Sequence, residues 1–474
     1  MNQLSIPRAA SSRYMFRRLI IPLICISIAF YVAWISRAPK ESEPIAVTHF
    51  EEAASPAKIL DQISLIHVED TIQKPLESII LTLRKSSDRF ENWITMGDLV
   101  AQIQRNTGEE RYYHDVELIY REALRLKPDS VEALTGMAWV TGGRHEFEKS
   151  IEWANQAITI DIDCAIAYGI LGDASLELGN YDAALDHYQR MMDIRPDLSS
   201  WSRGAHLLWI MGDKSKAQWL MNKAIHAGAP FAENTAWCKA RLATMLFQDG
   251  AILAAQDTIQ SLMDSGSKNR HILSIAAKIA TAKKEFSKAT DYYQQILSLG
   301  SNQEALTGIG DLLVLQGLPD QAETYYQKVE DMHQKQVSSG SHDHHFMAKF
   351  FADHDRSLIE ALRMSEEHKL TKNVYEADTL AWVYYKNGHI TKAIEAIKQA
   401  LRHNTPDAEI HYHAGLIASA YGDLTSAQKH LDKALQMNPN FNPLQITTLH
   451  KTLQDLENKK SLTHIKTRDQ EDHK

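Results

Sequence analysis

Small residues and prolines recur along this chain at a spacing of about 34 residues, a length known for helical repeats. Pro128 and Pro196 are separated by two such periods, and Ala393 and Ala427 by one. Apolar residues within a period follow helical spacing, and a proline at the end of a period prevents its last helix from continuing. A period of this length is typical of two-helix units that stack into a solenoid. The spacing therefore predicts an all-α repeat array, not three separate globular domains.

Residues 165–197 form the clearest unit. Tyr168 occupies the fourth place of this unit, Gly172 the eighth, Ala184 the twentieth and Tyr188 the twenty-fourth. This pattern resembles the tetratricopeptide repeat (TPR), in which small residues let two antiparallel helices approach and an aromatic ring fills the space beside them. The resemblance implies a right-handed superhelix, that is, an α-solenoid with a concave groove lined by the first helix of each unit.

The repeat frame extends over most of the chain. We predict about nine or ten units over residues 90–441, with an irregular one at 338–373. Residues 58–89 are predicted to form an N-terminal helical segment, and residues 442–474 a capping helix with a polar tail. The C-terminal run 381–388, together with residues 413–417 and 438–444, also looks like bacterial TPR proteins of unassigned role, and that likeness brings no activity with it.

An uncharged apolar run at residues 19–36 precedes the repeats. Eighteen residues in a helix span about 27 Å, enough for the hydrocarbon core of a bilayer. We predict a transmembrane helix there, after a basic tail at 1–18 and before a proline-containing linker at 37–57. The segment 1–40 carries six basic and no acidic side chains, whereas the whole chain has a net charge of −9. By the positive-inside rule, the N-terminus is predicted to be cytoplasmic and the TPR array periplasmic or extracellular.

Other interpretations of the N-terminal region stay open. A cleaved signal peptide needs small residues at its exit, but this run ends in Trp34-Ile35-Ser36-Arg37, which favours an uncleaved anchor. A lipoprotein would use Cys25, which lies in the middle of the run. An arginine-rich start without acidic residues is also compatible with an organellar transit peptide. If the charge rule fails, the TPR array lies in the cytoplasm.

The resemblance to the TPR family also implies which side chains line the groove. The partner-binding candidates are Trp139, Asp173, Trp382, Tyr385 and Tyr412. Further groove places hold Glu177, Lys278, Asp311, Asp378 and Lys386. Aromatic side chains could anchor an extended peptide or a partner helix; alternatively, Trp139 and Trp382 pack against the next repeat. We therefore predict protein or peptide partners, and no nucleic acid because the array is acidic.

No catalytic motif or cofactor-binding motif is present in the sequence, so we predict a scaffold and not an enzyme, with no cofactor and no metal. One cluster leaves an alternative open. His342, His344 and His345, with His354 nearby, could bind a metal or a small ligand, as an accessory function of loop 342–354. Cys164 and Cys238 lie in separate units and are predicted to be isolated thiols.

Overall fold

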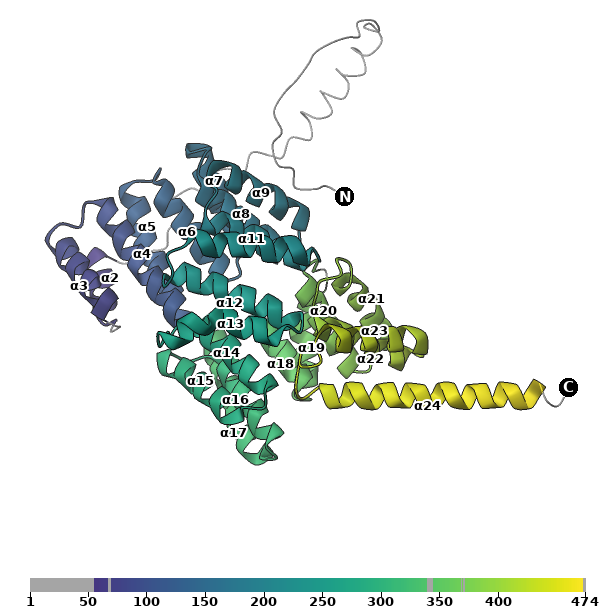
Figure 1. Ribbon diagram of the computed structural model, residues 1–474. Helices are drawn as coiled ribbons and strands as arrows, with labels where there is room; N and C mark the ends of the chain where they lie inside the picture. The colour runs from purple at the N-terminus through teal and green to yellow at the C-terminus, as the bar shows by residue number, and fades with distance from the viewer. Residues whose placement is uncertain (1–54, 67–69, 339–343, 368, 370, 472–474) are drawn as a thin grey trace, which may run out of the picture. The chain divides into compact units, whose positions relative to one another are not determined.

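The computed structural model describes residues 55–66, 70–338, 344–367, 369 and 371–471 of this chain. All regular secondary structure in this part is helical (Figure 1), and Glu52–Lys474 forms one compact unit. The all-α prediction is confirmed for these residues. The predicted tail at 1–18, the membrane helix at 19–36 and most of the linker at 37–57 lie outside them. Among the described helices, none has both the length and the apolar character that crossing a bilayer requires.

In the described part of the chain, two helices, α2 (Pro56–Ile63) and α3 (Asp70–Lys85), precede ten successive helix pairs, and α24 (Ile446–Glu471) follows them. The first five pairs are α4 (Phe90–Thr107) with α5 (Arg111–Leu126), α6 (Val131–Gly143) with α7 (Phe147–Ile160), α8 (Ala165–Glu177) with α9 (Tyr181–Ile194), α10 (Leu198–Ile210) with α11 (Lys214–Ala227), and α12 (Glu233–Gln248) with α13 (Ile252–Asp264). The last five are α14 (Arg270–Ala282) with α15 (Phe286–Leu299), α16 (Gln303–Leu315) with α17 (Pro319–Ser338), α18 (His345–Asp353) with α19 (Leu358–Glu367), α20 (Val374–Lys386) with α21 (Ile390–Ala400), and α22 (Ala408–Tyr421) with α23 (Leu424–Met437). The irregular stretch predicted at 338–373 contains α18 and α19, two of the shortest helices.

A glycine–aspartate–tyrosine set fixes the helices within several pairs. In α8, Gly172 faces the ring of Tyr188 so closely that a Cβ atom would overlap it. The Tyr188 hydroxyl then donates a 2.8 Å hydrogen bond to the carboxylate of Asp173. The same contact joins Tyr120 to Asp98 and Tyr326 to Asp311, each at 2.8 Å. The small residue thus permits the close approach of the two helices, and the aspartate next to it satisfies the buried hydroxyl.

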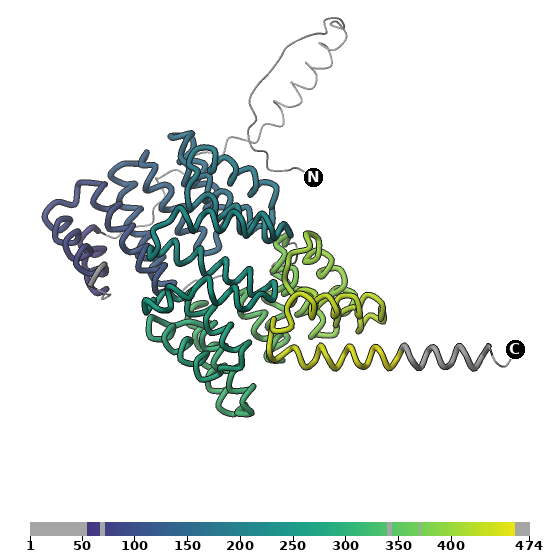
Figure 2. The backbone as a smooth tube through the Cα atoms, viewed as in Figure 1, coloured from purple at the N-terminus to yellow at the C-terminus, as the bar shows by residue number. Residues whose placement is uncertain are grey.

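Turns that lie far apart in the sequence contact one another directly. Asn373 donates through its side-chain amide to the backbone oxygen of Glu177 at 3.1 Å. Thr405 bonds the Ile210 oxygen at 2.6 Å, and Asn438 bonds the Phe247 oxygen at 2.9 Å. We call these three contacts the edge ladder. Since each one satisfies a backbone carbonyl at the end of α8, α10 or α12, the ladder fixes these helices against the turns that flank α20–α23 (Figure 2).

Candidate partner-binding site

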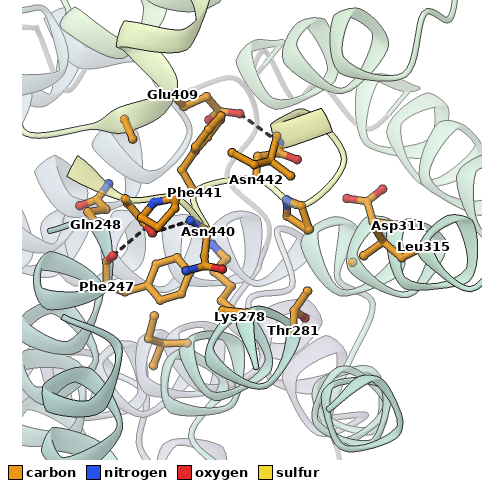
Figure 3. Close-up of a pocket in the computed structure, with 18 of the residues that line it drawn as sticks. Phe247, Gln248, Lys278, Thr281, Asp311, Leu315, Glu409, Asn440, Phe441 and Asn442 are labelled. Carbon is orange, nitrogen blue, oxygen red and sulfur yellow. Dashed lines mark hydrogen bonds between the residues drawn. The ribbon is translucent and has the colours of Figure 1, made fainter. Parts of the chain in front are cut away.

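A cavity of about 480 Å³ lies between the first helices of three pairs and the segment 438–443. Its walls come from α12, α14 and α16, with Asp407–Glu409 at the start of α22 on the opposite side. Figure 3 shows Phe441 and Asn442 beside Glu409, with Lys278 and Thr281 across the cavity. The cavity is thus enclosed by elements from both sides of the edge ladder.

Asparagine side chains give the segment Asn438-Pro-Asn-Phe-Asn-Pro443 its conformation. The Asn438 side-chain oxygen accepts from the backbone N–H of Asn440 at 2.8 Å, while its amide donates to Phe247. Asn442 accepts in the same way from the N–H of Leu444 at 3.1 Å and donates to Glu409 at 3.3 Å. Such local side-chain bonds define turns without secondary structure. The segment therefore presents Asn440 and Phe441 to the cavity from a fixed backbone.

Charged groups of both signs line the cavity. Lys278 and Glu304 form an ion pair of 2.8 Å, which raises the pKa of the lysine and lowers the pKa of the glutamate, so both are charged. Asp407 accepts from Gln248 at 2.9 Å. Burial, with the nearby charge of Glu409, raises the pKa of Asp407 to about 6. Aromatic, amide and charged groups in one cavity suit a ligand with both apolar and polar parts, such as a peptide.

Next to the cavity, Asp353, Glu409 and His413 bring ligand-type atoms within 4.8 Å of one another. His413 is fully buried and donates through Nδ1 to Asp378 at 3.0 Å. The ammonium of Lys349 lies 2.6 Å from Asp353 and 3.0 Å from Glu409. Burial lowers the pKa of Lys349, but these two carboxylates raise it by more, so the amine is charged. Lys349 thus occupies the place between the carboxylates where a cation would bind.

Three of the predicted partner-binding residues form one aromatic cluster. Trp382 stacks on Tyr385 with ring centroids 5.0 Å apart and on His413 at 4.2 Å, and the ring of Tyr412 lies 5.8 Å away. Trp382 is only 3% exposed and Tyr412 only 2%. The indole N–H of Trp382 donates to Asp353 at 2.9 Å. The side chains of Trp382 and Tyr412 therefore pack within the chain, as the alternative interpretation of Trp382 expected, and Tyr385 is half-buried beside them.

The other two predicted residues lie elsewhere on the array. Trp139 is half-buried and packs against Tyr113, with ring centroids 5.2 Å apart. Asp173 accepts hydrogen bonds from Tyr188 and from Arg203, the latter at 3.0 Å. Both side chains thus have partners inside the chain. Whether any of the five predicted residues contacts another protein stays a prediction.

Sequence reasoning placed Lys278 and Asp311 on the groove, and both line the cavity. It missed Lys349, Asp407, Glu409 and the segment 438–443. The segment follows α23, the last helix of the repeats, so the repeat pattern does not predict where its side chains point. Its alternation of asparagine and proline was the available signal, because this pattern indicates a defined turn.

Among the described residues, no histidine of loop 342–354 belongs to a group of three ligand-type side chains, although His344 and His345 line one small pocket. His354 lies 2.8 Å from Asp311 through Nε2 and bonds the Phe350 oxygen through Nδ1, so neither nitrogen faces a metal site. His344 lies 3.8 Å from Glu367, on another element. His342 lies outside the described residues. Cys164 and Cys238 are both free and buried, which confirms the prediction of isolated thiols.

The family model described as "Tetratricopeptide repeat" matches residues 154–199 and 379–440. A TPR protein from Parabacteroides merdae is 18% identical over 57% of this chain and 100% of its own, with a TM-score of 0.38. The APC/C complex Cut9–Hcn1 contains a chain that is 11% identical over 85% of this chain and 99% of its own, with a TM-score of 0.36. PilF from Pseudomonas aeruginosa is 15% identical over 52% and 92%, with a TM-score of 0.28. A comparison with curated protein sequences finds no significant match.

Proposed function

Because the chain is a tetratricopeptide-repeat protein, we propose that it is a scaffold that binds a peptide segment of a protein partner in the cavity between α12, α14, α16 and residues 438–443. Solenoids of this kind bind partners along their inner surface. From Phe90 to Met437 the described residues form successive helix pairs, with no additional domain inserted between them. This arrangement favours a binding function over a catalytic one.

The size and the lining of the cavity support this function. At about 480 Å³ it falls within the range of ligand pockets and holds a few side chains, not a folded domain. Phe247, Phe286 and Phe441 offer apolar surface, while Asn440 and Lys278 offer hydrogen-bond donors. An extended peptide presents both kinds of group at short intervals, so its chemistry matches these walls.

Site-specific photo-cross-linking tests the proposed cavity. A photoreactive residue at Thr281, which lines the cavity, should attach one partner polypeptide to the full-length chain in its native membrane fraction. Thr258 on α13 is the matched control, because its hydroxyl also bonds the backbone of its own helix, at 2.8 Å in both cases. We expect adducts from position 281 at least tenfold above those from position 258. Equal adducts from both positions, or none from 281, would contradict the proposal.

We further propose that residues 19–36 anchor the scaffold in a membrane, with the N-terminus in the cytoplasm and the TPR array outside it. The support is the uncharged apolar run itself, together with six basic side chains and no acidic ones in the segment 1–40. A reporter enzyme that is active only outside the cytoplasm, fused to Lys474, should be active. An inactive but intact fusion would instead place the array in the cytoplasm.

A further inference from the structure

Two successive pairs carry the same arginine contact with one difference. On α10, Arg203 reaches back to α8 and contacts both carboxylate oxygens of Asp173 at 3.0 Å. On α12, Arg241 reaches back to α10, where it meets His206 at 2.7 Å from Nδ1. The two partners, Asp173 and His206, each follow a small residue of the repeat frame, Gly172 and Ala205. The second contact is therefore a copy of the first in which an imidazole replaces the carboxylate.

Among the described residues, Arg241 lacks the direct carboxylate contact that Arg203 makes with Asp173. No carboxylate there forms an ion pair with it, and its Nε–H is buried without a hydrogen-bond partner. Burial lowers the pKa of Arg241 by more than Tyr375 and Glu177 raise it. Burial and then the charge of Arg241 lower the pKa of His206 well below its ordinary value, so this imidazole is neutral. Since an arginine keeps its charge in proteins, Arg241 is a buried cation, and among the described residues no carboxylate lies within ion-pair distance of it.

A second arginine in the same condition lies at the start of α14. Arg270 makes no hydrogen bond or ion pair among the described residues, and its Nε–H is also buried and unpaired. The neighbouring carboxylates are already used: Glu304 pairs with Lys278 at 2.8 Å, and Glu233 with Arg105 at 3.1 Å. Two guanidinium groups on the first helices of adjacent pairs thus form no ion pair in the described part of the chain.

His271, the residue after Arg270 on α14, is affected by the charges of both arginines. Burial, and after it the charges of Arg270 and Arg241, lower the pKa of His271 to about 4. A neutral imidazole there adds hydrogen-bonding capacity without adding charge. Trp237, one turn before Arg241 on α12, has its ring 5.8 Å from the Arg241 guanidinium carbon. Adjacent first helices therefore carry these groups: α12 has the indole ring and one guanidinium, and α14 has the second guanidinium and the neutral imidazole.

We propose that Arg241 and Arg270 bind carboxylate side chains of an acidic segment in a protein partner. The planar fork of donors on a guanidinium matches a carboxylate, and the ligand supplies the charge that Asp173 supplies to Arg203 within the chain. Trp237 offers apolar surface that a polypeptide can cover and a small hydrated anion cannot. This inference rests on the proposed scaffold function, because it names the chemistry of the partner.

Fluorescence anisotropy with the full-length chain in detergent tests this site. The probe is a labelled peptide containing four consecutive glutamates, and its match has four glutamines. We expect the glutamate peptide to bind at least tenfold more tightly, and Arg241→Gln or Arg270→Gln to weaken it about tenfold each. Arg190→Gln is the control, since Arg190 is an exposed arginine already paired with Asp163 at 2.9 Å. Equal binding of both peptides, or unchanged binding by the two variants, would overturn the proposal.

His206→Asp separates a binding role from a structural one. The new carboxylate would compensate Arg241 as Asp173 compensates Arg203, so we expect a higher melting temperature together with at least tenfold weaker binding of the glutamate peptide. A lower melting temperature, or unchanged binding, would contradict the assignment. Competition by free glutarate or inorganic phosphate at the same concentration as the peptide would mean a small-anion site and overturn the choice of a polypeptide. If this site fails while Thr281 still traps a partner, the scaffold function stands and only the acidic segment is rejected.

Discussion

Gly179→Ala is expected to lower the free energy of unfolding by about 2–4 kcal/mol, through the edge ladder. Gly179 has a φ of +69°, where an alanine costs about 1 kcal/mol or more. Its Cβ atom would also overlap the carbonyl carbon of Lys372 and the nitrogen of Asn373, which are backbone atoms that cannot rotate away. Overpacking of this kind adds about 1–3 kcal/mol. Urea unfolding of the full-length chain measures the sum.

Gly388→Ala is the matched control for this prediction. Gly388 lies in the corresponding turn between α20 and α21, with a φ of +77°, and nothing lies within 4 Å of the place its Cβ would take. In this variant the free energy of unfolding should fall only by the conformational cost of the positive φ, about 1 kcal/mol. Hydrogen exchange should report the same contrast: the amide of Val374, which donates to Tyr181 at 2.9 Å, should exchange faster only in Gly179→Ala. Equal losses in both variants would mean that the ladder adds no stability.

The repeat units were predictable because their interactions are local. The set of Gly172, Asp173 and Tyr188 lies within a single repeat period, and its spacing alone indicates two helices in close contact. The edge ladder could not be predicted in this way. Its contacts join residues 191 to 196 apart, a separation fixed by small rotations between neighbouring pairs that add up along the solenoid. The sequence of any single unit does not indicate the total rotation that accumulates over several units.

The candidate site was predictable only in part, for a related reason. The repeat pattern predicts which side chains point away from the inner face of a helix, but it does not predict which residues of other units lie opposite them. The repeat frame left Trp382 either facing a groove or packing against the next repeat, and in the structure the short helix α18 brings Asp353 to its indole N–H. Lys278 and Asp311 line the cavity, as side chains on the inner side of their helices can. The absence of an ion pair at Arg241 and Arg270 likewise could not be predicted from the sequence, because it depends on neighbours that come from other repeat units.

Trp382→Ala is expected to lower the free energy of unfolding by about 3–5 kcal/mol, the usual range for removing a buried tryptophan. The indole is 3% exposed, lies between Tyr385 and His413, and donates to Asp353. Its removal would leave a cavity beside the carboxylate, which would also lose one of its hydrogen-bond donors. Trp382→Phe keeps most of the apolar contact and loses that donor, so we expect a smaller loss of about 1–2 kcal/mol.

Trp219→Ala is the control, because Trp219 on α11 is 62% exposed and its replacement should change stability by less than about 1 kcal/mol. Urea unfolding followed by circular dichroism allows the three variants to be compared without the fluorescence of the mutated residues. If Trp382→Ala retained nearly the stability of the native chain, the indole would not be a core residue, and its original assignment as a partner-binding anchor would regain support. If the loss of stability is as large as expected, any reduced partner binding by Trp382→Ala reflects the collapse of the aromatic cluster beside the cavity. Binding itself is then tested only by replacements that leave the fold intact, such as the photoreactive residue at Thr281.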